Sequence, residues 1–272
     1  MLDVDKLRGK AANIRLRTLK LIVDAGTGHT GGALSEADIL TTLYYSVMKH
    51  DPDNPDWDAR DRYVQSKGHA VEPLYCILSD LGYFSDETLS TFSRFGSPLI
   101  GHPNNKVPGI EMNSGALGHG LSVAVGMALA GKMDKKDYHV YCLMGDGEQE
   151  EGSVWEAAMA AANYGLDNLT AIIDRNGLQI SGSTEDVMRL EPLADKYRAF
   201  GFNVIEIDGH DYMQIYDALT FRKAGVPTLV LARTIKGKGV SFMENAAKWH
   251  HGVPKGEQLE TAVRELEEAL AK

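Results

Sequence analysis

The chain has 272 residues, of which 43% are hydrophobic and 24% are charged, a balance typical of a globular protein and not of a disordered or fibrous one. Its formal charge of −10 argues against general binding to nucleic acids or membrane surfaces, because Lys236-Gly237-Lys238 is only a local basic pair. With two cysteines, no apolar leader and no apolar run of about 20 residues, a reducing, cytoplasmic location is expected.

The predicted elements of the first half are mainly helices. Apolar residues at helical spacing predict a first helix that ends at Gly26, and Ser35 is the expected N-cap of the second. A third helix is expected from near His69 to Gly82. The segment 120–132 is small and apolar on every side, which predicts a helix that is buried all round.

The second half alternates strands with helices. Strands are expected at 139–144, 169–174, 203–208 and 228–233, with helices at about 153–165, 191–200 and 211–223 and an amphipathic helix in the tail. This alternation predicts an α/β fold, a parallel sheet flanked by helices, formed by a single domain over residues 1–272. The long loops 94–115 and 235–256 are candidates for functional segments.

A glycine-rich acidic turn, Gly145-Asp146-Gly147, follows the first of these four strands. Ligands of parallel sheets lie beyond the carboxyl ends of the strands, and a carboxylate there suits a divalent metal that a phosphate also ligates. The next strand ends before Asn176 and the Leu178 carbonyl, which could share that metal. The alternative is a structural turn with a solvated acidic segment, favoured for Glu148 and Glu150.

The histidines are also arranged unusually. Five of the nine directly follow a glycine: His29, His69, His102, His119 and His210. A zinc site is disfavoured because the sequence lacks cysteine partners and an HExxH spacing. Imidazoles that bind hydroxyl groups and transfer protons near neutral pH fit a polyhydroxylated substrate better, although each histidine taken singly is more often structural.

Several motifs in order resemble the N-terminal, diphosphate-binding half of transketolase, a thiamine diphosphate enzyme. The resemblance covers about residues 6–256 and is carried by GDG with Arg175-Asn176 and by TGHTGGALSEADIL, SKGHAVEPLYCIL, GHP, SGALGHGLSVAVGMA and KGKGVSFMEN…WHHGVP. Because transketolase is normally a much longer chain, the resemblance implies the N-terminal subunit of a split, two-chain enzyme. The pyrimidine-binding and C-terminal domains would then belong to a partner subunit, in an α2β2 heterotetramer.

The resemblance implies roles for individual residues. Mg²⁺, or another divalent cation such as Ca²⁺ or Mn²⁺, would be held by Asp146, Asn176 and the Leu178 carbonyl. The implied contacts of thiamine diphosphate are Gly145, Gly147, His69, His251 and Asn176 at the diphosphate end, and Gly115, Ala116 and Leu117 near the aminopyrimidine. The implied catalytic residues are His29, His102 and His251. Glu151 and Glu156 match glutamates that lie between cofactor sites at the subunit interface, and Glu151 also counts as a cofactor-site residue.

The chain departs from the family pattern at three positions. Thr30 replaces a proline, Arg175 replaces the first asparagine of a pair, and His119 stands where glutamine is common. His250 beside His251 leaves the last histidine ambiguous, and His251 is preferred because HGVP continues as the motif does.

The implied reaction is the transfer of a two-carbon ketol unit from a ketose phosphate to an aldose phosphate, with the cofactor supplying the carbanion chemistry and the protein the positioning. Three alternatives are an α subunit of a thiamine-dependent 2-oxoacid dehydrogenase, a deoxyxylulose-phosphate synthase and a non-catalytic cofactor-binding module. The first two are disfavoured, because the loops around His29, His102 and His251 are not expected in those enzymes.

Overall fold

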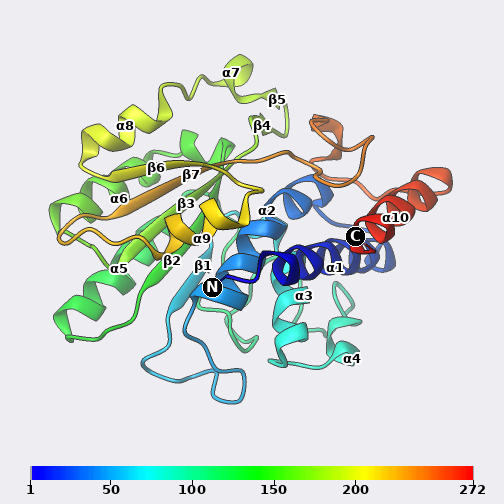
Figure 1. Ribbon diagram of the computed structural model, residues 1–272, viewed down its shortest axis with the longest axis horizontal. Coiled ribbons are helices and arrows are strands. Elements are labelled where there is room, and N and C mark those ends of the chain that lie inside the picture. Colours follow the sequence, from blue (N-terminus) through cyan, green and yellow to red (C-terminus); the bar gives the residue numbers. More distant parts are fainter. Residues whose placement is uncertain (1, 272) are drawn as a thin grey trace.

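The computed structural model describes residues 2–271 (Figure 1). A five-stranded sheet forms its centre, with all neighbouring strands parallel and the order β1-β2-β3-β7-β6. The strands are β1 (Arg62–Gln65), β2 (Val140–Gly145), β3 (Leu169–Arg175), β7 (Thr228–Arg233) and β6 (Asn203–Asp208). The predicted α/β class and all four predicted strands are confirmed. Strand β1 was not predicted, because its four residues show no long apolar run.

Helices cover both faces of the sheet (Figure 1). One core contains side chains of α1 (Val4–Ala25), α2 (Thr30–Thr42), α3 (Glu72–Leu81) and α9 (Tyr212–Thr220), and the other those of α5 (Gly120–Met133), α6 (Gly152–Asn163) and α8 (Leu193–Phe200). Strand β2 serves both, since Tyr141 and Leu143 face the first core and Cys142 and Met144 the second. Burial on both faces explains why the central strands β2, β3 and β7 are mainly apolar.

Two predictions about helices are wrong. Helix α2 begins at Thr30, so Ser35 lies inside it and hydrogen-bonds to Asp174 Oδ2 at 2.6 Å instead of capping it. Tertiary packing therefore overrides the low helix propensity of Gly31 and Gly32 in the first turn. Helix α5 is buried on one side only, because its outer side faces away from the sheet and leaves Val123 37% and Met133 74% exposed. The expected ends of α1 and α3 are confirmed, at Gly26 and Gly82 in left-handed conformation.

The remaining elements are short, except for the tail helix. Helical turns α4 (Asp86–Leu89) and α7 (Thr184–Val187) and the antiparallel pair β4 (Leu178–Gln179) and β5 (Gly182–Ser183) lie in connections. Helix α10 (Glu257–Leu270) is the expected amphipathic helix and packs against α1. A third core joins these two helices to the loop before α10, with members Leu16, Leu19, Leu34, Val240, Met243, Trp249, Ala262 and Leu266.

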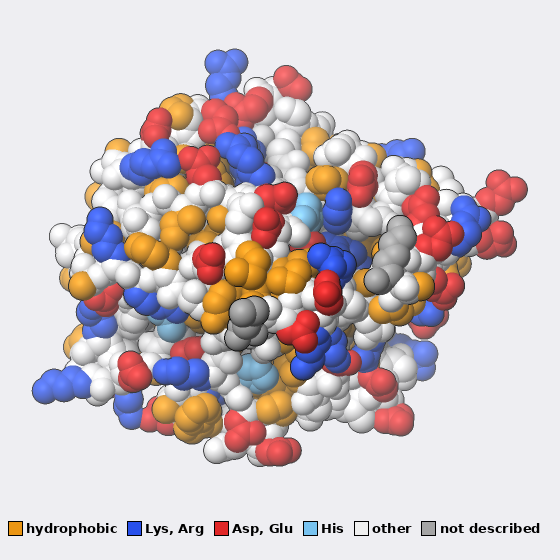
Figure 2. Space-filling view, in the orientation of Figure 1, with side chains coloured by type: hydrophobic (Ala, Val, Ile, Leu, Met, Phe, Trp, Pro, Cys, Tyr) orange, Lys and Arg blue, Asp and Glu red, His pale blue; other side chains and the backbone are white. Residues whose placement is uncertain are grey.

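The surface carries both signs of charge. On the face shown in Figure 2, acidic and basic side chains are interspersed and neither sign forms a broad field, which agrees with the inference against general nucleic-acid binding. Both cysteines are buried and free. Between residues 2 and 271, no helix is long and apolar enough to cross a membrane.

Candidate active site

A cavity of about 340 Å³ lies at the carboxyl ends of four of the five strands. The segment after β1 contributes Lys67 and His69, β2 leads to Asp146, β3 to Asn176, and β7 to Lys236. Parallel strands present their carboxyl ends at one edge of a sheet, so segments far apart in sequence converge there.

The predicted metal ligands lie together in this cavity. Asp146, Asn176 and Leu178 all line it, and Asn176 Oδ1 accepts the Leu178 N–H at 3.1 Å. The Asp146 carboxylate accepts the Gly177 N–H at 2.5 Å and an Arg175 N–H at 3.1 Å. Burial raises the pKa of Asp146 to about 6, although Arg175 opposes that shift. A buried carboxylate, a side-chain amide and a carbonyl group fit a hard cation such as Mg²⁺.

Lys236 is a buried cation at the same cavity. It is 3% exposed, its Nζ lies 3.1 Å from Nδ1 of His250, and no carboxylate of residues 2–271 lies within 4.0 Å of it. Burial, with the nearby charge of Lys67, lowers the pKa of Lys236 to about 8. A buried ammonium group without an acidic partner is costly, and an anion in the cavity, such as a diphosphate, would compensate it.

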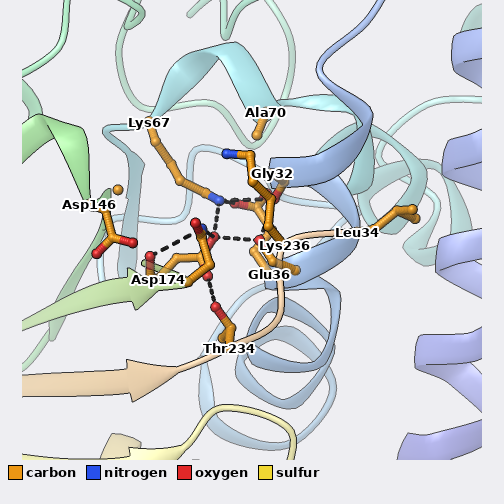
Figure 3. A network of polar contacts seen from close by, with 12 residues as sticks. Gly32, Leu34, Glu36, Lys67, Ala70, Asp146, Asp174, Thr234 and Lys236 are labelled. Carbon is orange, nitrogen blue, oxygen red and sulfur yellow. Dashed lines mark hydrogen bonds and ion pairs between the residues drawn. The ribbon is translucent and has the colours of Figure 1, made fainter. Parts of the chain in front are cut away.

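A buried ionic network supports the cavity floor (Figure 3). Lys67 Nζ lies 2.9 Å from Glu36 and also contacts Asp174, and all three side chains are at most 2% exposed. Asp174, at the end of β3, also accepts hydrogen bonds from Ser35 and Thr234. Burial raises the pKa of Glu36 to about 8, whereas Lys67 holds the pKa of Asp174 below its usual value despite burial. This network fixes α2 to the strand ends next to the cavity.

The histidines of separate motifs converge beside the cavity, around His29. Its ring centroid lies 4.7 Å from that of His251, 5.0 Å from His69, 5.6 Å from His250 and 6.5 Å from His102. The rings of His69 and His250 stack at 5.3 Å. The predicted catalytic residues His29, His102 and His251 are therefore close together. They lie next to the cavity, whereas His69 and His250 line the cavity itself.

His29, His69 and His250 are held neutral. Burial and neighbouring positive groups lower the pKa of His29 to about 4, of His250 to about 3 and of His69 to about 2. Burial also lowers the pKa of His102. A neutral imidazole can accept a hydrogen bond or a proton through one ring nitrogen and donate through the other, as proton transfer to and from hydroxyl groups requires.

The departure at Thr30 has a structural reason. The Thr30 hydroxyl donates to the Gly252 carbonyl at 2.5 Å, and the Gly252 N–H donates to the Gly28 carbonyl at 3.3 Å. A proline at position 30 has no such hydroxyl. These bonds tie the loop of His29 to the loop of His250 and His251.

Glycines of the motifs allow close contacts. Gly115 has φ +133°, and a Cβ atom there would lie 2.3 Å from Cδ2 of His102. A Cβ atom on Gly118 would lie 2.6 Å from that of Glu151. Gly115 and Leu117 line the cavity with Gly145 and Gly147, whereas Ala116 is exposed and does not line it. His119 hydrogen-bonds to the Leu117 carbonyl at 3.1 Å and so supports the same turn.

The glutamates that follow Gly147 differ in their exposure to solvent. Glu150, Glu151 and Glu156 are exposed, whereas Glu148 is 1% exposed. Glu148 accepts the backbone N–H groups of Gly118 at 2.9 Å and Gly145 at 3.0 Å. The expectation of a solvated Glu148 is therefore wrong, because this carboxylate satisfies backbone donors that would otherwise be buried without partners.

Sequence reasoning missed several residues of the cavity wall: Lys67, Lys236, Gln179 and Ile180. It also preferred His251 to His250, and it is His250 that lines the cavity. Lys236 follows strand β7 by only three residues, so its position beyond a strand end was the available signal. The two histidines at 250 and 251 could not be distinguished by motif alone, since only the path of the chain turns His250 toward Lys236.

The fold and the site define a class: α/β proteins that bind a ligand beyond the carboxyl ends of parallel strands. The family described as "Transketolase, thiamine diphosphate binding domain" matches residues 8–270, and the chain belongs to this family. This membership supports a transketolase subunit over the 2-oxoacid dehydrogenase alternative.

Individual relatives agree. The chain is 53% identical to a subunit of the apulose-4-phosphate transketolase of Phocaeicola vulgatus, over 100% of this chain and 97% of the relative. It is 46% identical to a 6-deoxy-6-sulfo-D-fructose transketolase subunit of a Clostridium species, over 96% of each chain. The crystal structure of transketolase from Campylobacter jejuni matches with a TM-score of 0.91 and 36% identity, over 96% of this chain and 43% of that one. The chain thus spans less than half of that solved transketolase.

Proposed function

We propose that this chain is the cofactor-binding subunit of a two-chain, cytoplasmic transketolase, which transfers a two-carbon ketol unit from a ketose phosphate to an aldose phosphate. The observation that carries the proposal is the placement of Lys236, a buried ammonium group without a carboxylate partner among residues 2–271, in the same cavity as Asp146 and Asn176. One anion bound to both the ammonium group and a divalent cation satisfies this arrangement.

In this proposal the bound thiamine diphosphate supplies the carbanion chemistry, and the chain supplies binding and proton transfer. Lys236 and His69 bind the diphosphate, and Asp146, Asn176 and the Leu178 carbonyl hold Mg²⁺. His29 and His251, with rings 4.7 Å apart, bind the substrate hydroxyl and carbonyl oxygens. Because the ring of His29 is neutral, it can accept the hydroxyl proton that leaves when the carbon–carbon bond breaks.

A partner subunit is the second part of the proposal. Ile180, on the cavity wall, is 70% exposed. An exposed apolar side chain at the wall of an open cavity favours a protein partner that covers it. The occupant we propose is the pyrimidine-binding subunit, assembled with this chain as α2β2, because both similar relatives are named as transketolase subunits.

The names of the same two relatives indicate only the class of the donor sugar, which is a ketose with an anionic end group. The two names specify a phosphate and a sulfonate. Apulose 4-phosphate is the first donor to assay, because the relative named for it is 53% identical over the whole chain.

The test is reconstitution. The tagged chain is purified from its native cells with thiamine diphosphate and Mg²⁺, the accompanying protein is identified by mass spectrometry, and the pair is assayed for ketol transfer from apulose 4-phosphate. Activity that is lost in a variant carrying both His29→Ala and His251→Ala supports the proposal. A cofactor-loaded pair that transfers no ketol unit from any ketose phosphate would indicate a non-catalytic module. Decarboxylation of a 2-oxoacid instead would indicate the dehydrogenase alternative.

A further inference from the structure

The segment between β3 and α8 forms one wall of the cavity but has little regular structure. It contributes Leu178, Gln179 and Ile180 to the wall. Strands β4 and β5 have two residues each, and α7 is a single helical turn. A two-stranded hairpin of this size is not stable by itself in water, so other contacts must hold it in place.

Arg175 makes these contacts. Its side chain is 6% exposed. One terminal nitrogen donates to Asp146 Oδ1 at 3.1 Å and to Thr184 at 2.9 Å, and the other donates to Glu185 at 3.1 Å and to Glu191 at 3.0 Å. A single guanidinium group therefore joins the end of β2, helical turn α7 and the residues before α8.

The acceptors are themselves anchored. Glu185 Oε1 also accepts the Leu190 N–H at 3.2 Å, and Glu191 Oε2 accepts the Leu193 N–H at 2.8 Å. At the cavity, Asp146 is held on its second oxygen by the Gly177 N–H at 2.5 Å. Its carboxylate thus has one bond from Arg175 and one from the start of the hairpin, and both fix its orientation.

We propose that Arg175 is a positioning residue, whose forked guanidinium group holds the Asp146 carboxylate and the wall segment 178–191 in one fixed arrangement. The inference rests on the proposed function only where it concerns the metal, because the ordering of the wall does not depend on a ligand. The alternative is that Arg175 merely neutralises Asp146. Lysine distinguishes the two, since it keeps the charge but cannot donate to four acceptors from a planar fork.

The first experiment measures the order of the wall without cofactor. Arg189 is exposed within the segment, so the initial rate of tryptic cleavage after it, followed by mass spectrometry on the full chain, reports how often the segment opens. We expect Arg175→Lys to raise this rate about tenfold, the effect of losing roughly one charge-assisted hydrogen bond. Thr184→Val, which removes one acceptor and leaves the charges unchanged, should raise the rate by a smaller factor.

The matched control is Arg198→Lys. Arg198 also joins two carboxylates, Asp195 at 2.7 Å and Glu206 at 3.0 Å, but neither lies in the wall segment. The rate of tryptic cleavage after Arg189 in the Arg198→Lys variant should equal that in the unaltered chain. A wild-type rate in Arg175→Lys would overturn the proposal, because charge alone would then suffice. Thermal unfolding of each variant checks that the rest of the chain is folded.

The second experiment measures Mn²⁺ binding in the presence of thiamine diphosphate by electron paramagnetic resonance. Because Arg175→Lys leaves the net charge unchanged, a dissociation constant raised about tenfold reports the lost orientation of Asp146. An unchanged constant contradicts this part of the proposal. The measurement uses the chain reconstituted with its partner. If that unaltered pair binds no Mn²⁺ with thiamine diphosphate, the proposed function fails, whereas the cleavage experiment still decides the role of Arg175 in the wall.

Discussion

The ammonium group of Lys236 lies 3.1 Å from Nδ1 of His250, and no carboxylate between residues 2 and 271 lies within 4.0 Å of it. We expect Lys236→Met to weaken the binding of thiamine diphosphate about 10- to 100-fold, because a hydrogen bond to a charged group contributes about 1.5–3 kcal/mol. Isothermal titration calorimetry with Mg²⁺ present measures the dissociation constant.

The control is Lys238→Met. Lys238 lies two positions further on, is 34% exposed at its side chain and is 3.9 Å from Glu244. Its removal should change the dissociation constant by less than about twofold, because an exposed ion pair contributes little. Equal losses in the two variants would mean that general positive charge, and not the buried position of Lys236, binds the cofactor.

Lys67→Met should strongly destabilise the fold. The substitution leaves Glu36 and Asp174 buried without their shared cation, and breaking a buried pair costs about 3–5 kcal/mol. The free energy of unfolding in urea measures the loss. Lys132→Met is the matched control, because the Lys132–Asp167 pair is about one-third exposed and should contribute about 0–1 kcal/mol. A loss no larger than that of the control would show that the network is not needed for stability.

The histidine cluster should make the fold sensitive to acid. The pKa of His29 is lowered to about 4 and that of His250 to about 3, whereas an unfolded histidine titrates near pH 6.5. The unfolded chain therefore binds protons first, and stability is lost as pH falls from about 6.5 toward those values. Melting temperatures from pH 7.5 to 4.5 measure this loss, and the decline should be shallower in His250→Asn. An identical slope in the two proteins would contradict the role of His250.

Glu72 should act in the opposite direction. It accepts the His29 N–H at 3.1 Å, and burial raises its pKa to about 7. An unfolded glutamate ionises near pH 4.3, so this carboxyl group removes stability as pH rises from there through about 7. In Glu72→Gln, which keeps an acceptor for His29, the melting temperature relative to that of the unaltered chain should therefore be higher at pH 8 than at pH 5. No difference between the two melting profiles would show that Glu72 is not protonated in the fold.

Much of the fold followed from sequence pattern, because buried parallel strands are continuous apolar runs. Residues 203–208 and 228–233 were predicted with the bounds that β6 and β7 have. Strand β1 and the start of α2 were not predictable in this way, since short length and glycine obscure periodicity and tertiary packing decides the outcome. Motifs likewise indicated Asp146, Asn176 and the histidines, and the structure brings them together.

The rest of the site depends on distances that no local pattern encodes. Lys67 and Asp174 are 107 positions apart in sequence, so their ion pair could be seen only after the strands were placed side by side. Arg175 departs from a motif, which marks it as unusual, but its four acceptors come from three separate segments of the chain. The role of a buried charge depends on the partners that it contacts, and positions in the sequence do not reveal those partners.

The packing of α10 on α1 has a consequence for synthesis. Leu16 and Leu19 share a core with Trp249, Ala262 and Leu266, so a ribosome makes one side of this core long before the other. The loop that carries His250 lies between the two and has no complete support until Glu257–Leu270 has emerged. The central sheet can form once β7 (Thr228–Arg233) has emerged, whereas the loop of His250 gains its full support only after α10 has followed.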